Sequence, residues 1–109
     1  MGHDIYGLNK KGKEIAYARF SMSNSNARIL YRVLNAQDKD GGVSGIGAVA
    51  DFDFHQMESA RKTFLGHTKD LRNIPPGSLA HHDIQQISTF LTNCKETAHR
   101  EGKVQVYFG

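Results

Sequence analysis

The chain has 109 residues, of which 39% are hydrophobic and 23% charged. These values are typical of a single globular domain and exclude a disordered or fibrous chain. The formal net charge of +3 favours anionic partners, but the basic residues are spread out with acids between them, so no nucleic-acid-binding arm is indicated.

One cysteine, Cys94, excludes an internal disulfide framework and favours the cytosol. The N-terminus has no secretory pattern, and no apolar run approaches the roughly 20 residues that span a bilayer. We therefore expect a cytoplasmic protein, in the cytosol of its host cell, with no membrane partner.

The N-terminal segment predicts a β-hairpin. Residues 4–8 form its first strand, residues 9–13 a turn, and residues 14–20 its second strand. Gly12 supplies the positive φ that the turn needs. Alternation separates two faces of the second strand: Ile15, Tyr17 and Arg19 on one, and Ala16, Ala18 and Phe20 on the other.

A first helix is predicted over residues 25–35. Several good N-cap residues precede it in the stretch 21–26, and apolar residues then recur at helical spacing. Residues 41–50 contain four glycines and are predicted as an irregular loop.

Two further helices are expected. The first is capped by Asp53 and closed by Gly66, and a loop containing Pro75 and Pro76 follows over residues 67–80. The second runs from about His82 to Arg100, because its apolar residues form a continuous stripe: Ile84, Ile87, Leu91, Cys94 and Ala98.

Gly102 ends the last helix, and residues 103–109 alternate as a final strand. The predicted fold is one α+β domain over residues 1–109. In it, the hairpin and the C-terminal strand form a small antiparallel sheet of three strands, packed with three helices. Open sheet edges make a homodimer or higher oligomer plausible.

The predicted start of the first helix is rich in polar residues, namely Ser21, Ser23, Asn24, Ser25 and Asn26. Free N–H groups and the positive end of the helix dipole favour an anion there. Arg19 and Arg28 could add charge-assisted bonds to a phosphate or carboxylate. The alternative is redundant helix capping by side chains that otherwise face water.

The glycine-rich loop is the second candidate, because closely spaced glycines expose successive N–H groups to an anion. Gly42, Ser44 and Gly45 are its candidate ligand-binding residues. The spacing matches neither a P-loop nor a dinucleotide-binding motif. The alternative is a tight connection in which Val43 and Ile46 plug the core.

Metal binding and catalysis receive little support. Asp51, Asp53 and His55 would share a face only if the strand continued through all three. Cys94 lies on an apolar helix face, where a free cysteine is usually inert packing, and His3 and Asp4 point to opposite faces of their strand. We predict a protein without cofactor, metal or enzymatic activity.

Together these patterns predict a site for a small anionic or nucleotide-derived ligand, in which arginines neutralise phosphate and Tyr6 or Tyr17 stacks on a base. The predicted ligand-binding residues are Tyr6, Tyr17, Arg19, Ser23, Asn24, Asn26, Arg28, Gly42, Ser44 and Gly45.

Four segments resemble a family of small bacteriophage and prophage proteins: residues 1–7, 14–19, 42–45 and 106–109, of which the first reads MGHDIYG. The resemblance implies a phage accessory protein, of a kind that counters host defence by sequestering a nucleotide signal or by blocking a defence enzyme. The alternative functions are a module that inhibits a host defence protein by direct interaction, and a weak nucleic-acid binder.

Overall fold

The computed structural model describes residues 2–21, 27–41, 45–68 and 79–109. Within these ranges the elements are β1 (Gly2–Leu8), β2 (Glu14–Ser21), α1 (Ala27–Val33), the 3-10 helix η1 (Gln37–Lys39), β3 (Ala48–Asp53), α2 (Phe54–Thr68), α3 (Leu79–Glu101) and β4 (Lys103–Phe108). The α+β class, the N-terminal hairpin and the C-terminal strand are confirmed.

The sheet has four strands, not the predicted three, in the order β2-β1-β4-β3, and every neighbouring pair is antiparallel. The additional strand is β3, whose first residues fall in the segment predicted as loop. Glycines precede this strand, and Ala48 and Ala50 are too small to reveal the alternation, in which Phe52 alone is fully buried.

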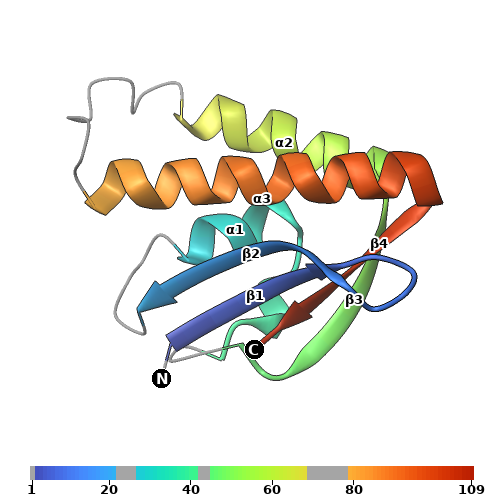
Figure 1. Cartoon of the computed structure of the whole chain (residues 1–109). Coiled ribbons are helices and arrows are strands. Elements are labelled where there is room, and N and C mark those ends of the chain that lie inside the picture. Colours follow the sequence, from blue (N-terminus) through green and yellow to red (C-terminus); the bar gives the residue numbers. More distant parts are fainter. Residues whose placement is uncertain (1, 22–26, 42–44, 69–78) are drawn as a thin grey trace.

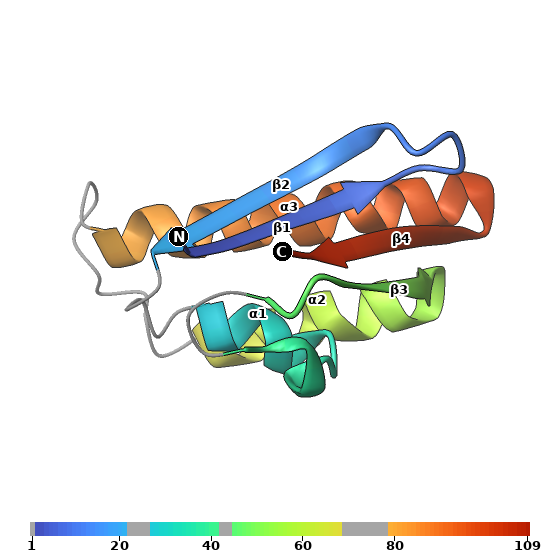
Figure 2. The ribbon, with the colours of Figure 1, turned by 90° about the horizontal axis from the view of Figure 1, so that it is seen from below.

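The fold has two layers. α2 and α3 lie side by side on one face of the sheet (Figure 1), and the view from below shows β2, β1 and β4 in front of α3 (Figure 2). Inward-facing strand residues such as Ile5, Phe20 and Val106 pack with Ile87 and Leu91 of α3. No described helix covers the opposite face, which we call the open face.

The boundaries of the two long helices have clear local causes. Asp53 caps α2 as predicted: its carboxylate accepts a bond from the Gln56 N–H, and the Gln56 side chain accepts one from the Asp53 N–H, both at 2.8 Å. α2 continues past Gly66, where the sequence predicted its end. α3 ends at Gly102, whose φ of 87° is in the left-handed region.

α1 packs beside the ends of β1 and β4. Its Tyr31 stacks on Phe108 with ring centroids 5.5 Å apart, and the Tyr31 hydroxyl hydrogen-bonds to Nδ1 of the buried His3 at 2.8 Å. His3 therefore belongs to the core while Asp4 faces outward, as the strand alternation predicted.

The predicted faces of β2 need one correction. The pairing of β1 and β2 is irregular between Gly7 and Leu8, so that Gly7 lies opposite Ala16 and Leu8 opposite Glu14. Ile15 is the extra residue and packs against the core. Tyr17 and Arg19 share one face as predicted, and Glu14 lies on the same open face, opposite Leu8.

Within the described ranges, none of the helices combines the length and the apolarity needed to cross a membrane.

Candidate functional site

The predicted ligand-binding residues fall into three groups. Tyr6, Tyr17 and Arg19 share the open face, while Arg28 is exposed on α1 and Gly45 lies beside the end of β4. The remaining five lie outside the described residues: Ser23, Asn24, Asn26, Gly42 and Ser44. The interpretation of Val43 as a core residue also lies outside them.

The open face carries a row of three tyrosines from three neighbouring strands. Tyr6 lies opposite Tyr17 of β2 on one side and Tyr107 of β4 on the other, and Val49 of β3 continues the row. The ring centroids of Tyr6 and Tyr17 are 5.0 Å apart, and those of Tyr6 and Tyr107 are 6.1 Å apart. We call Tyr17, Tyr6 and Tyr107 the tyrosine row.

Strand pairing explains these two spacings. Asp4 exchanges both backbone hydrogen bonds with Gly109, so Tyr6, two residues further on, also directs its backbone groups toward β4. The pair of Tyr6 with Tyr17 is therefore of the non-hydrogen-bonded type, in which opposed side chains lie closer together. The tyrosine row is a direct product of the sheet register.

Tyr17, Asp4 and Arg19 form a polar cluster at one end of this row. The Tyr17 hydroxyl donates to Asp4 Oδ1 at 2.6 Å, and Arg19 Nε lies 3.7 Å from the same oxygen. The bond to Asp4 is the main reason why the pKa of Tyr17 rises from 10.0 to about 12. A phosphate approaching Arg19 would thus meet a carboxylate already in place.

Gly45 has a packing role. Its N–H donates to the Gly109 carbonyl at 2.9 Å, and a Cβ at this position would lie 2.6 Å from the carbonyl of Phe108. The backbone at residue 45 therefore needs glycine in order to approach β4. Ile46, one of the two residues considered as a core plug, is 57% exposed instead.

The charges of the open face do not suit a phosphate. By register and alternation, the outward-facing charged residues of the strands comprise four acids and two bases: Asp4, Glu14, Asp51, Asp53, Arg19 and Lys103. Arg19 pairs with Asp4, and Lys103 Nζ lies 3.7 Å from Asp51 Oδ2. The predicted placement of an anion beside Arg19 therefore has no electrostatic support from the described residues.

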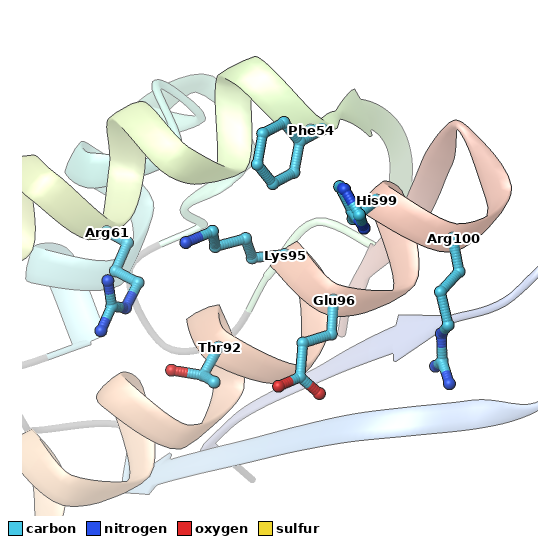
Figure 3. Close-up of a pocket in the computed structure, with 7 residues that line it drawn as sticks. All are labelled: Phe54, Arg61, Thr92, Lys95, Glu96, His99 and Arg100. Atoms are coloured by element: carbon cyan, nitrogen blue, oxygen red, sulfur yellow. The ribbon is translucent and has the colours of Figure 1, made fainter.

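A groove on the helical layer has the opposite character. It runs between α2 and α3 with a cavity volume of about 560 Å³ (Figure 3), and its lining residues are Phe54, Arg61, Thr92, Lys95, Glu96, His99 and Arg100. Phe54 and Arg61 come from α2, and the others follow one face of α3 at helical spacing. We call this the α2–α3 groove.

Two cations and two rings define its floor. Lys95 extends between Arg61 and Phe54, while Glu96 and Arg100 point away from Phe54 at the rim (Figure 3). Lys95 Nζ lies 5.7 Å from the centroid of the Phe54 ring, and the ring of His99 is 5.1 Å from it.

The cations of the groove are not engaged in ion pairs with described residues. Among the described residues, neither Arg61 nor Lys95 nor Arg100 makes an ion pair within 4.0 Å. Glu58, on the adjacent turn of α2, is engaged by Lys62 at 3.1 Å, which lowers the pKa of this carboxyl. The groove therefore presents positive charge that is available to an incoming anion.

The sequence prediction missed this groove because its residues lie up to 46 positions apart, from Phe54 to Arg100. A signal did exist in the chain: Thr92, Lys95, Glu96 and His99 occupy one helical face, away from the apolar stripe. Only the packing of α2 against α3 brings Arg61 and Phe54 to that face.

Comparison of the chain with protein-family models, with curated proteins and with solved structures finds no match.

Proposed function

We propose that this protein binds a small phosphorylated or nucleotide-derived molecule in the α2–α3 groove and holds it without turnover. The observation that carries the proposal is the pairing of Arg61 and Lys95, which have no ion-pair partner among the described residues, with the aromatic floor of Phe54. Anionic groups bind to such cations, and planar bases stack on such a ring. The volume is in the range of small-molecule sites.

The dimensions of the groove support a ligand with a ring at one end and a charge at the other. Phe54 and Arg61 are seven residues apart on α2, a rise of about 10 Å. Lys95 lies between them. A nucleotide would direct its base toward Phe54 and His99, and its phosphate toward Lys95 and Arg61.

Binding without chemistry agrees with the side chains at hand. Cys94 is buried, and burial raises the pKa of its thiol to about 12, so it is a poor nucleophile. Thr92 supplies the hydroxyl group of the groove, and none of its described neighbours hydrogen-bonds to it as a general base would.

The biological role that we propose is that of a phage accessory protein acting in the host cytosol, where it would sequester a nucleotide signal of host defence. The resemblance of the four sequence segments supports this role. The alternative role, inhibition of a host protein by direct contact, is favoured by the exposed aromatic side chains of the open face. Nucleic-acid binding is less well supported, because carboxylates outnumber cations there.

Isothermal titration calorimetry against cyclic dinucleotides, ADP-ribose derivatives and mononucleotides tests the proposal. We expect at least one to bind, with an affinity that falls as salt is added. Arg61→Gln and Lys95→Gln should each weaken this binding by about tenfold or more, because each removes a charge-assisted contact.

Lys13→Gln is the matched control, since it removes one positive charge from an exposed residue that does not line the groove. It should leave the affinity within about twofold, as expected of an exposed charge that does not contact the ligand. An absence of heat with every compound, in a folded sample, would exclude the proposed function. If Arg19→Gln or Arg28→Gln abolished binding while Arg61→Gln kept the full affinity, the ligand would bind beside Arg19 and Arg28, as the sequence predicted, and not in the α2–α3 groove.

A further inference from the structure

The open face concentrates the exposed apolar surface of the protein. Tyr17 of the tyrosine row and Val49, which continues it, are 43% and 47% exposed, and Ile46, shortly before β3, is 57% exposed. Among the described large apolar side chains, only Leu65 of α2 is comparably exposed elsewhere. Such a contiguous aromatic patch is typical of a surface that another protein covers.

The charges on this face are mostly compensated. Asp4 is held by Tyr17 and Arg19, Asp51 lies near Lys103, and Asp53 caps α2. Glu14 differs, because it makes no ion pair with any described residue. Because the face carries four acids and two bases, a second copy is favoured only in an orientation that places Glu14 near a cation.

We propose that two copies of this chain associate face to face through their tyrosine rows. The two-fold axis runs along the row, so that Tyr6 of one copy lies against Tyr6 of the other. This axis reverses the strand direction between copies, and it brings Arg19 at one end of β2 over Glu14 at the other end of the second copy's β2. Each Glu14 then faces Arg19 of the other copy, a cation that it shares with Asp4, and the contact occurs twice by symmetry.

A contact through the edge of β2 is less favourable. The side chain of Gln86 occupies the outer edge of β2, where it bonds to both backbone groups of Arg19. A strand from another molecule would have to displace it. The face, and not this edge, is thus the accessible surface.

The area of the sheet sets the strength of this association. Four strands spaced about 4.8 Å apart, with six residues rising about 3.3 Å each, give a face of roughly 400 Å² per copy. The pair therefore covers about half of the roughly 1,600 Å² of a standard interface. We infer a weak, reversible dimer with a dissociation constant in the range of about 1 to 100 μM.

Sedimentation velocity over about 1 μM to 1 mM protein tests the dimer. We expect the sedimentation coefficient to rise with concentration as a monomer converts to a dimer. Val49→Lys should weaken association by about tenfold or more, since it places two like charges in the contact. Leu65→Lys is the control, because Leu65 has the same 47% exposure on the helical layer.

A charge exchange tests the orientation. Glu14→Arg and Arg19→Glu should each reduce self-association, because the first places two arginines together and the second two glutamates. An equimolar mixture of the two variants should associate more tightly than either alone, since every facing pair is then of opposite charge. Circular dichroism confirms that each variant is folded.

Three results would overturn the proposal: a monomer at every concentration, a dimer that Val49→Lys does not weaken, or a mixture that associates no better than its components. None of these results bears on the α2–α3 groove, because the groove and the tyrosine row lie on different layers of the fold. The dimer and the proposed ligand binding can therefore fail separately.

Discussion

Gln86 pairs with the backbone of Arg19 as a neighbouring strand would. Its Nε2 donates to the Arg19 carbonyl at 2.8 Å, and its Oε1 accepts from the Arg19 N–H at 3.1 Å. The same Nε2 lies 3.2 Å from Oδ1 of the buried Asp83. A single side chain of α3 thereby satisfies the outer edge of β2 and fastens the helix to the sheet.

Gln86→Ala should lower the free energy of unfolding by about 1 to 2 kcal/mol, because the N–H and the carbonyl of Arg19 lose the hydrogen bonds that Gln86 makes to them. It should also raise the tendency to aggregate, since the edge of β2 becomes available for strand pairing. Urea denaturation and light scattering measure the two effects. Gln85→Ala, the neighbouring exposed position on α3, is the control and should change neither.

The Tyr17 phenol should lose its proton at a higher pH than an ordinary tyrosine, because it donates a hydrogen bond to Asp4. Its native pKa of about 12 lies above the ordinary 10.0, so it contributes stability that is fully present below pH 10. This contribution is lost as the pH rises from about 10 through 12. Asp4→Asn should lower the pKa of Tyr17 toward 10, which tyrosine ¹³Cζ chemical shifts measure residue by residue.

Tyr31 provides the internal reference for that titration. Its pKa is also raised to about 12, but chiefly by burial and not by Asp4. Asp4→Asn should leave the Tyr31 resonance unchanged. Equal shifts of both tyrosines would show that the variant loosens the fold instead of removing one hydrogen bond.

Replacement by alanine should have opposite effects on stability at two glycines, Gly45 and Gly66. Gly45→Ala places a Cβ 2.6 Å from the Phe108 backbone, and we expect the free energy of unfolding to fall by about 2 kcal/mol or more. Gly66 lies within α2 with nothing within 4 Å of its Cβ position, so Gly66→Ala should stabilise by up to about 1 kcal/mol. Thermal unfolding compares them. A neutral Gly45→Ala would contradict the packing role of this residue.

Thr97 on α3 carries a buried hydroxyl with no hydrogen-bond partner among the described residues. Thr97→Val keeps the shape of the side chain and removes the unsatisfied group. We expect the free energy of unfolding to rise by about 1 kcal/mol. Thr97→Ser, which keeps the hydroxyl and removes a methyl group, should instead destabilise the protein in the same denaturation assay.

Local patterns in the sequence predicted those elements whose causes are local. The Asp53 cap, the stop at Gly102 and the apolar stripe of α3 each depend on residues within a few positions of one another. β3 escaped prediction because its pairing partner, β4, lies some 50 residues away and its own residues alternate weakly. The position of Ile15 depends on a pairing irregularity that the residues of β2 do not reveal.

The candidate site divides in the same way. Sequence reasoning placed Tyr17 and Arg19 on one face correctly, since alternation along a strand is local. It did not foresee that Asp4 pairs with Arg19, because this contact follows from the register of β1 and β2. The α2–α3 groove depends on which faces of two helices meet, and that choice is made by the whole core.

The sheet separates the α2–α3 groove from the tyrosine row, and this separation fixes the geometry of the proposed dimer. Joining two open faces directs the two grooves outward, in opposite directions. One small molecule would then be unable to reach both, and the two sites would fill independently. A long molecule carrying repeated phosphorylated groups would instead link one dimer to the next, so the same protein would act as a capture agent for small ligands and as a cross-linker for polymeric ones.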